Sequence, residues 1–330
     1  MRILFVGGTG IISSACSRRV VELGHELHLL VRGSSSQQRP PPEAARLILG
    51  DIRDPSSVEP QLADFYDAVV DFVAFTPEHV ETDLKLFAQR TAQLVFISSA
   101  SAYHKPVRQL PIVESTLLHN PFWKYSRDKI ACEARLMRAY SEAGVPITIV
   151  RPSHTYDQTL LPFDPHGAGP TVLQRITNGL PIVVHGDGTS LWTLTHHRDF
   201  SVGLVGLLGH PAAIGEAFHI TSDEVLPWNE IVHCVARAAG KTARLVHVPS
   251  DIIARHHPDW GAGLLGDKAH SVQFDNSKIR RLVPEFRPKI RFFEGAQEIV
   301  AYYKNHPERC TSDENINRLM DQLAHEYLPG

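Results

Sequence analysis

The stretch RILFVGGTGIIS, residues 2–13, runs from a short apolar segment through a glycine loop into a segment with helical spacing. The apolar segment is rich in β-forming residues and predicts a buried strand. Glycines at such a turn let a pyrophosphate approach the backbone, and the start of the next helix offers unpaired N–H groups and the positive end of its dipole. The order strand, glycine loop, helix therefore predicts a dinucleotide site, with a ligand-free tight turn as the alternative. The contacts expected there come from Gly7, Thr9, Gly10, Ile11 and Ile12.

Strands and helices continue to alternate as far as about residue 155. Apolar segments such as ELHLLVR (26–32), DAVVDFVAF (67–75) and PITIVRPS (146–153) alternate with segments of helical spacing. Continuously apolar strands belong in a parallel sheet that is covered on both faces. We therefore expect an α/β fold with a Rossmann-type, doubly wound parallel sheet.

The second half has longer loops rich in Pro, Gly and His, and it predicts a smaller C-terminal α+β lobe. We expect residues 1–155 to form the dinucleotide-binding domain and residues 156–330 to form mainly the substrate-binding lobe. The helix DFSVGLVGLLG is expected to return to the first domain, near residues 195–215. The short strands EAFHIT (216–221) and RLVHVPS (244–250) are expected within the lobe. A cleft between the two parts is the expected ligand site.

Composition limits the classes of partner. Of the 330 residues 43% are hydrophobic and 21% are charged, and the formal net charge is −3, so we expect no nucleic-acid or anionic-membrane partner. No apolar run approaches the roughly 18 residues that span a bilayer, and the N-terminus does not read as a secretory signal. Four widely spaced cysteines favour free thiols in a reducing cytoplasm. The adjacent histidine pairs lack the spacing of a metal shell, so we expect no metal.

The end of the second expected strand bears on the choice of cofactor. Arg32, followed by Ser34 and Ser35, offers a cation and hydroxyls where the 2′-phosphate of NADP would lie. This favours NADP slightly over NAD, with a solvent-facing arginine as the alternative. After the third expected strand, Asp51 and Ile52 are placed to meet the adenine edge.

The segment WKYSRDK, residues 123–129, places Tyr125 and Lys129 one helical turn apart on one face. A phenol held near an ammonium is more easily ionised near neutral pH. Alone, this spacing occurs by chance in many helices. The fifth expected strand, however, ends in FISSASAY (96–103), and catalytic groups gather at the carboxyl ends of parallel strands.

With these motifs, and with GDIRD, VRPS, GLPIVVHGDG and FDNSKIRRLVPEF in the same order, the chain resembles the extended, or atypical-extended, short-chain dehydrogenase/reductases of the NAD-dependent epimerase/dehydratase family. The resemblance covers nearly the whole chain. It implies that Tyr125 is the acid/base and that Lys129 holds the nicotinamide ribose and favours the phenolate. It also implies that Ser99 hydrogen-bonds the substrate oxygen, with Ser98 or Ser101 as the alternatives.

The chain departs from the family pattern in two places. Ser13 replaces the third glycine of the loop, where it either separates helix and strand or hydrogen-bonds a phosphate. The two arginines that grip the diphosphate of nucleotide sugars are missing. Lys268 or His270 could substitute, and Arg175 or Arg280 could reach a diphosphate from other loops. The substrate pocket expected instead, for a sugar ring or another polyol, is formed by Ser101, His154, Trp192 and His196, which could equally be lobe core.

Three functions compete on the sequence alone. The resemblance favours an NAD(P)-dependent sugar-modifying enzyme of the epimerase/dehydratase type, acting on a sugar or sugar nucleotide. The alternative is a net NADPH-dependent reductase or dehydrogenase of a keto-sugar or other polyol, and a non-catalytic relative that senses dinucleotides or binds RNA is less favoured. The resemblance also implies a homodimer through residues 77–90 and 124–144, because the second segment has more apolar positions than one sheet-facing stripe requires.

Overall fold

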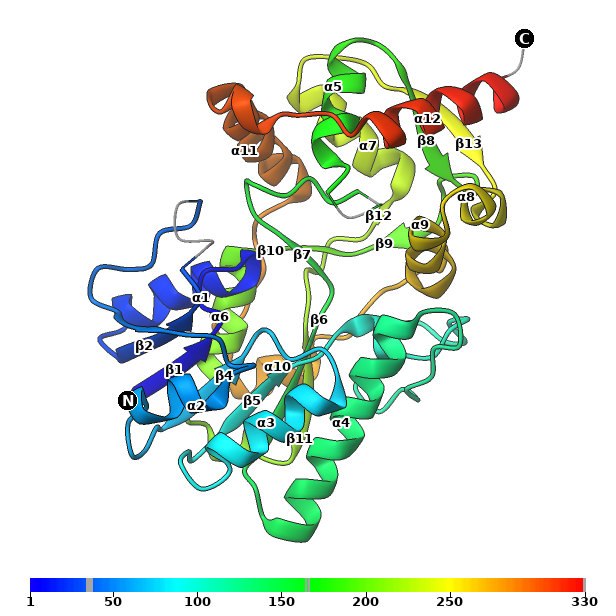
Figure 1. Ribbon diagram of the computed structural model, residues 1–330. Helices are drawn as coiled ribbons and strands as arrows, with labels where there is room; N and C mark the ends of the chain where they lie inside the picture. Colours follow the sequence, from blue (N-terminus) through cyan, green and yellow to red (C-terminus); the bar gives the residue numbers. More distant parts are fainter. Residues whose placement is uncertain (34–37, 164, 166, 329–330) are drawn as a thin grey trace.

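The computed structural model describes residues 1–33, 38–163, 165 and 167–328 of the chain (Figure 1). Its centre is a sheet of seven parallel strands in the order β11-β6-β5-β4-β1-β2-β3. The strands are β1 (Arg2–Val6), β2 (Glu26–Val31), β3 (Arg46–Leu49), β4 (Ala68–Asp71), β5 (Leu94–Ile97), β6 (Ile147–Pro152) and β11 (Glu216–Ile220). The predicted Rossmann-type, doubly wound sheet is confirmed.

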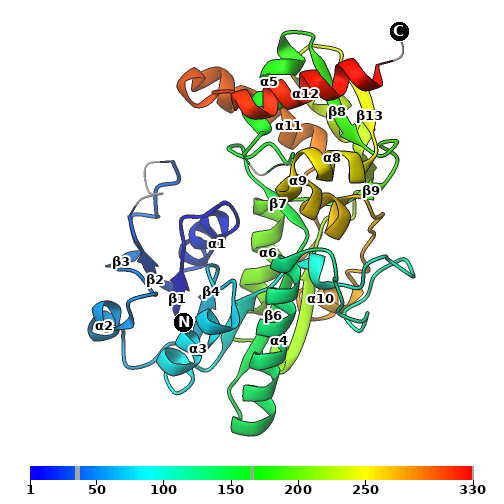
Figure 2. The ribbon, with the colours of Figure 1, turned by 45° about the vertical axis from the view of Figure 1, so that its right-hand side comes forward.

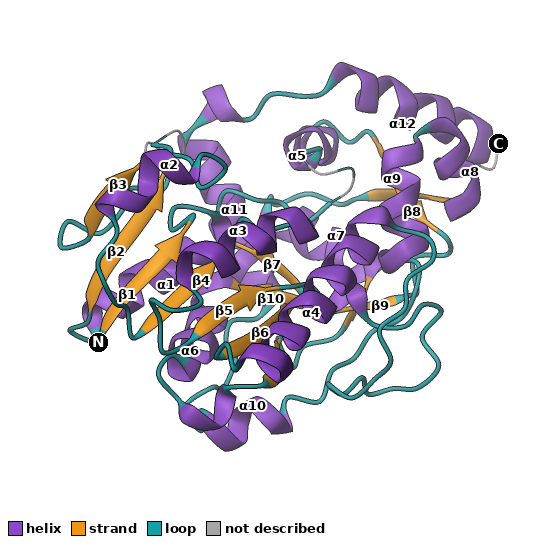
Figure 3. Cartoon of the chain, turned by 60° about the horizontal axis from the view of Figure 1, so that its bottom comes forward, coloured by secondary structure: helices purple, strands orange, loops and turns teal. Residues whose placement is uncertain are grey.

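Helices cover both faces of this sheet, and its central strands are accordingly buried and mostly apolar (Figure 3). One face packs against α1 (Ile11–Glu22), α6 (His197–Leu207) and α10 (Ser277–Leu282). The other packs against α3 (Pro77–Phe87), α4 (Lys124–Ala143) and the short α2 (Pro55–Val58). The two resulting cores hold the carboxyl ends of β1, β4 and β5 at one edge, where the candidate site lies.

A second lobe with its own hydrophobic core stands over the carboxyl ends of the strands (Figures 1 and 2). Its longer helices are α5 (Gly169–Thr177), α7 (Trp228–Ala238), α11 (Phe292–Asn305) and α12 (Glu314–Tyr327). Around them lie β7 (His154–Tyr156), β8 (Pro181–His185), β9 (Leu191–Trp192), β10 (Leu194–His196), β12 (Leu226–Pro227), β13 (Arg244–Val248), α8 (Ser250–His256), α9 (Pro258–Gly263) and the π-helical η4 (Leu264–Lys268). The 3₁₀ turns in the described part of the chain are η1 (Glu59–Gln61), η2 (Ala100–Ala102), η3 (Pro211–Ala213) and η5 (Pro307–Arg309).

The chain returns to the first part over a longer stretch than the sequence indicated. The segment EAFHIT was expected within the lobe, but it forms β11, the edge strand of the main sheet, parallel to β6. The sequence of this five-residue strand does not indicate which strand it pairs with. Its neighbour β6 lies about 70 residues earlier in the chain, and strand pairing depends on such distant residues. The segment RLVHVPS does lie in the lobe, where β13 pairs with β8.

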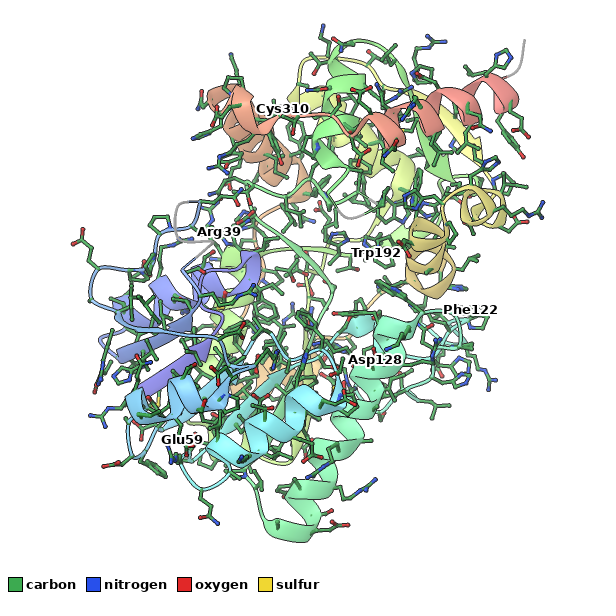
Figure 4. The ribbon with its side chains drawn as sticks, in the orientation of Figure 1. Arg39, Glu59, Phe122, Asp128, Trp192 and Cys310 are labelled. Carbon is green, nitrogen blue, oxygen red and sulfur yellow. The ribbon has the colours of Figure 1, made fainter. Side chains whose placement is uncertain are left out.

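Ion pairs join the two parts. Arg39, which precedes β3, donates to the buried carboxylate of Asp157 in the lobe at 2.6 Å. Figure 4 shows Arg39 where the first part of the chain meets the lobe. Lys105 and Asp267 form a second, buried pair at 3.1 Å. These contacts fix the lobe over the sheet.

No described helix has the length and apolarity needed to cross a membrane. All four cysteines are free thiols. Within the described ranges, no group of three or more His, Cys, Asp or Glu side chains is arranged to hold a metal ion.

Candidate active site

The loop between β1 and α1 is packed so closely that glycine is required at two positions. Gly7 has a φ of +85°, and a Cβ atom there would lie 2.5 Å from the Cγ1 atom of Val73. A Cβ atom on Gly8 would lie 2.4 Å from the side chain of Leu29. Gly10 is the N-cap of α1. The loop therefore forms a backbone cradle at a helix N-terminus, the arrangement that receives a pyrophosphate.

Ser13 links two residues of the glycine loop by hydrogen bonds from its side chain. Its Oγ atom accepts a hydrogen bond from the Gly10 N–H at 2.8 Å and donates one to the Gly7 carbonyl at 2.6 Å. The side chain is buried and is held by the loop's own backbone. It thus stabilises the turn in place of the close packing that a third glycine allows.

Two cavities meet at the cradle, since both are lined by Gly7, Gly10, Val73 and Phe75. The smaller, of about 290 Å³, lies beyond the ends of β2 and β3. Its lining includes the sequence-predicted cofactor residues Thr9, Arg32, Asp51 and Ile52.

The arginine expected to favour NADP lies on the rim of this smaller cavity. The Arg32 side chain is 72% exposed, and its guanidinium lies 3.9 Å from the Asp51 carboxylate. It therefore faces solvent and a carboxylate together. Ser34 and Ser35 lie outside the described residues.

The larger cavity, of about 600 Å³, lies between the cradle, the ends of β5 and β6, and the lobe. Among the sequence-predicted residues, Ile11, Ile12, Ser99, Ser101, Tyr125, His154 and Trp192 line it. Figure 4 shows Trp192 on the lobe side, facing the space above the sheet. These residues come from α1, the β5–η2 turn, α4, β7 and β9, so the fold brings together groups that are far apart in sequence.

Lys129 does not line the cavity but lies behind Tyr125 in the protein interior. Its Nζ atom donates to the carbonyl oxygens of Ala74 at 2.6 Å and Ile97 at 2.7 Å, and it lies 5.9 Å from the centre of the Tyr125 ring. Burial lowers the pKa of Lys129 to about 8, against the opposing effect of nearby negative groups, of which Asp71 is the largest. Lys129 is thus held at the meeting point of β4, β5 and α4.

Burial raises the pKa of the Tyr125 phenol to about 12, and a hydrogen bond with Ser99 acts in the opposite direction. In the chain alone the phenol is therefore protonated at neutral pH. Ser99 also hydrogen-bonds Ser101 at 2.9 Å, and Ser126 donates to Ser101 at 2.8 Å. Three serine hydroxyls thus form a chain that ends at the phenol.

Two residues that the sequence offered for substrate contact are engaged elsewhere. Ser98 donates to Glu133 in a buried network, facing away from the cavity lining. His196 is not brought to the cavity: its Nε2 atom lies 3.2 Å from the Glu298 carboxylate and its Nδ1 atom accepts from the Arg198 N–H. The expectation that His196 contacts substrate is therefore dropped, because its position at the N-cap of α6 uses both ring nitrogens.

Of the basic residues offered by the sequence in place of the missing arginines, only Lys268 lines the larger cavity. Arg175 is buried in the lobe core, where it contacts Asn317 and Asp321. Arg280 pairs with Asp223. His270 donates from its Nε2 atom to the Leu265 carbonyl at 2.9 Å and is not part of the lining.

Several residues that line the larger cavity belong to no sequence motif that would have marked them as part of the site. They are mostly aromatic or apolar and are Phe75, Trp123, Leu160, Val272 and Phe274, with Thr193 and Asp267 as polar members. Only Trp123, two residues before Tyr125, has a position that could have indicated it. Phe75 reaches the cavity from the turn after β4, and the remaining residues reach it through the packing of the lobe, which no local pattern encodes.

A seven-stranded parallel sheet with a glycine cradle after its first strand defines a Rossmann-type dinucleotide-binding protein. Residues 3–221 match the model of the NAD dependent epimerase/dehydratase family, and the chain belongs to that family. The relatives include epimerases, dehydratases and reductases, so the chain is an NAD(P)-dependent enzyme of the short-chain dehydrogenase/reductase superfamily. The family expected from the motifs is confirmed.

The chain is 27% identical over 294 residues to 2′-dehydrokanamycin reductase of Streptomyces kanamyceticus, a match that spans 88% of this chain and 81% of that protein. It is 28% identical over 251 residues to chloroplast stem-loop binding protein of 41 kDa b of Arabidopsis thaliana, spanning 72% of this chain and 63% of that protein. An epimerase structure from Methanothermobacter thermautotrophicus superposes with a TM-score of 0.78 at 20% identity, covering 93% of both chains. At this identity the structural likeness shows the fold alone.

Proposed function

We propose that this chain catalyses hydride transfer between NAD(P) and a secondary carbinol or carbonyl carbon of a sugar or related polyol, with Tyr125 as the acid/base. The observation that carries the proposal is the position of the Tyr125–Ser99 pair in the cavity that the glycine cradle also lines. A dinucleotide fits that cradle, because Gly7 and Gly8 leave no room for a side chain where the backbone must approach a pyrophosphate. When bound, it supplies the hydride donor or acceptor.

In reduction, Ser99 hydrogen-bonds the carbonyl oxygen and Tyr125 gives that oxygen its phenolic proton. In oxidation, Tyr125 takes the proton from the substrate hydroxyl. Lys129 favours the phenolate, since with a pKa of about 8 it is mostly an ammonium at pH 7. Two of its three N–H groups are held by the Ala74 and Ile97 carbonyls, and the third would be left for the nicotinamide ribose, the role that the family resemblance implies.

The proposed substrate has no nucleotide diphosphate. Lys268 is the only lysine or arginine among the described residues that line the larger cavity. It is a single ammonium group, and a lysine lacks the bidentate fork with which an arginine grips a phosphate. The faces of Trp123 and Trp192 suit the apolar face of a sugar ring instead.

Net reduction is the favoured reaction within this proposal. An epimerase must keep its keto-sugar intermediate bound while the sugar ring rotates to present its other face to the cofactor. A diphosphate outside the ring would anchor the intermediate during this rotation, and the described lining lacks the arginines that would hold a diphosphate. Dehydration requires a second acid/base to remove the proton beside the carbonyl. The only carboxylate in the described lining is Asp267, and it is paired with Lys105. The similarity to a reductase over 88% of the chain agrees with this choice.

A redox-neutral epimerase is the second candidate, supported by the family as a whole. The non-catalytic or RNA-binding alternative has the name of one relative in its favour. The net charge of −3 and the intact Tyr125 and Lys129 count against it. For the cofactor we propose a preference for NADP, on the position of Arg32 at the rim of the smaller cavity.

We further propose a cytoplasmic homodimer. The exposed face of α4 carries Ala131 and Ala134, with Ile130 and Met137 half-buried beside them. Small and apolar residues on an exposed helix face are suited to packing against the same helix of a second copy.

The experiment is to incubate the purified chain with NADPH and a panel of keto-sugars and keto-cyclitols, free and nucleotide-linked, and to follow the reduced nicotinamide. The proposal expects stoichiometric loss of NADPH with a free keto-sugar. Conversion of a sugar nucleotide with retained cofactor and no net loss of NADPH would favour the epimerase instead.

A further inference from the structure

Two buried aspartates lie directly behind the candidate site. Asp71 is the last residue of β4 and is 1% exposed, and Asp83 lies in α3 and is 3% exposed. Each has one buried oxygen that finds no hydrogen-bond donor among the described residues, Oδ2 of Asp71 and Oδ1 of Asp83. A buried carboxylate oxygen without a donor is costly, so these two atoms need an explanation.

The two carboxyl groups act on each other: the charge of Asp71 and a hydrogen bond with it both raise the pKa of Asp83. Two ionised carboxylates have only acceptors, so a bond between them requires a proton. One proton placed between the carboxyl groups would give both unpartnered oxygens a partner at once.

The surroundings indicate which residue carries the proton. The Oδ1 atom of Asp71 accepts the N–H groups of Val73 and Ala74, the latter at 2.8 Å, and such bonds favour the ionised form. Burial and the charge of Asp71 raise the pKa of Asp83 well above its usual value. Asp83 is therefore the donor and Asp71 the acceptor.

We propose that Asp71 and Asp83 share one proton, carried by Asp83, and that the single negative charge left on the pair holds Lys129 as an ammonium beneath the meeting point of the two cavities. The pair acts through Lys129 and through the β4–α3 turn. Asp71 binds two N–H groups of that turn, and Lys129 binds its Ala74 carbonyl. The same turn contributes Val73 and Phe75 to the wall of both cavities.

Several other groups bear on these charges. Arg53 favours the ionised form of Asp83, and Lys129 does so too. His79 is influenced by both Arg53 and Asp71, and burial lowers its pKa. On the far side, Glu133 and Cys132 face Lys129. Asp71 has the largest effect of the charged groups on Lys129, so one charge on the pair suffices for the role proposed.

The first test concerns the proton alone and does not depend on the proposed function. A carboxyl whose pKa is raised by folding binds a proton that the unfolded chain releases above about pH 4, so its contribution makes the fold less stable as pH rises. Asp83→Asn keeps a donor towards Asp71 and removes this titration. The wild type should therefore lose stability between pH 5 and pH 7, whereas the variant should not lose it for this reason. We expect the ratio of the folding equilibrium constants, variant over wild type, to rise by up to about tenfold for each pH unit in this range.

The measurement is urea unfolding of the cofactor-free protein, followed by tryptophan fluorescence. The exposed Asp251→Asn, whose partner is Arg255 on the same helix, is the matched control and should show a flat ratio. Infrared difference spectra of the folded wild type and variant at pH 7 provide a second readout, in which the wild type should show a protonated carboxyl band. A flat ratio for Asp83→Asn and no such band would overturn the shared proton.

The second test concerns Lys129 and rests on the proposed function. Asp83→Asn keeps one negative charge on the pair, whereas the double variant Asp71→Asn/Asp83→Asn keeps the hydrogen bonds but removes the charge. We expect the single variant to bind NADPH with the wild-type pH profile. As pH rises, the double variant should begin to lose NADPH affinity at a lower pH than the wild type does. Its affinity relative to the wild type should be about tenfold lower at pH 8 than at pH 6. Identical profiles for all three proteins would contradict the link to Lys129 while leaving the first test unaffected.

Discussion

Replacing Arg32 by Ala should weaken the binding of NADP much more than the binding of NAD. Arg32 lines the smaller cavity at the ends of β2 and β3, where the adenosine ribose of a dinucleotide would lie. Only NADP carries a phosphate on that ribose. The charge of Arg32 therefore acts on one cofactor and hardly on the other.

The expected size follows from the exposure of the side chain. Two unit charges 4 Å apart attract by about 1 kcal/mol in bulk water and about 4 kcal/mol at an effective dielectric constant of 20. Arg32 is 72% exposed, so the value for water is the appropriate one. A phosphate with nearly two charges then gains about 2 kcal/mol, or roughly 30-fold in affinity. The Asp51 carboxylate, 3.9 Å from Arg32, repels the same phosphate and reduces this figure.

We therefore expect Arg32→Ala to weaken NADP binding by about 10- to 30-fold and NAD binding by less than about threefold. Isothermal titration calorimetry with both cofactors at low and high salt measures this directly. The NADP preference should shrink in 1 M salt, where the screening length falls to about 3 Å. Arg18→Ala, an exposed arginine of α1 outside the smaller cavity, is the matched control. Equal losses for both cofactors, or a wild-type preference for NAD, would refute the assignment.

Three more predictions concern the glycine loop, the diphosphate and the dimer. Ser13→Ala should lower the free energy of unfolding by about 1–3 kcal/mol, because two hydrogen bonds of the glycine loop are lost, and it should retain the NADP affinity of the folded molecule. Chemical denaturation measures the stability and calorimetry measures the affinity. A large loss of affinity would show that Ser13 binds the cofactor. UDP should bind weakly compared with NADP. Two charged hydrogen bonds worth roughly 1.5–3 kcal/mol each are missing, which weakens UDP binding by about a hundredfold or more relative to a site that has both arginines. A low-micromolar dissociation constant for UDP in the presence of NADP would reveal an anchor for phosphates. Light scattering at micromolar concentration should give the mass of a dimer, and Ala134→Arg on the exposed face of α4 should give a monomer; a monomeric wild type would end that proposal.

The sheet and the cradle could be predicted from the sequence because they depend on local patterns. The run of apolar residues before Gly7 and the helical spacing after Gly10 are both contained within about 20 residues. The same holds for Tyr125 and Lys129, whose spacing places them on one helix face. Such features need no knowledge of distant contacts.

The rest of the site depends on how distant segments pack. His196 and Trp192 lie in one short stretch and were expected together, yet only Trp192 lines the cavity, since the turn into α6 directs His196 to Glu298. Asp71 and Asp83 lie in an apolar strand and an ordinary helix, with no motif to mark them. Their relation to Lys129 appears only when β4, α3 and α4 are brought together.

The proposed function depends above all on Tyr125 exchanging a proton with the substrate oxygen. Tyr125→Phe removes one hydroxyl that is hydrogen-bonded to Ser99 and leaves the ring between Phe75 and Trp123. The decisive measurement is single-turnover hydride transfer from NADPH in the wild type and in this variant, with the best substrate of the panel. We predict a loss of about a hundredfold or more in the rate, since a positioned general acid contributes about 10²–10⁴-fold, with cofactor affinity nearly unchanged. Hydride transfer at close to the wild-type rate in Tyr125→Phe would remove this residue from the mechanism.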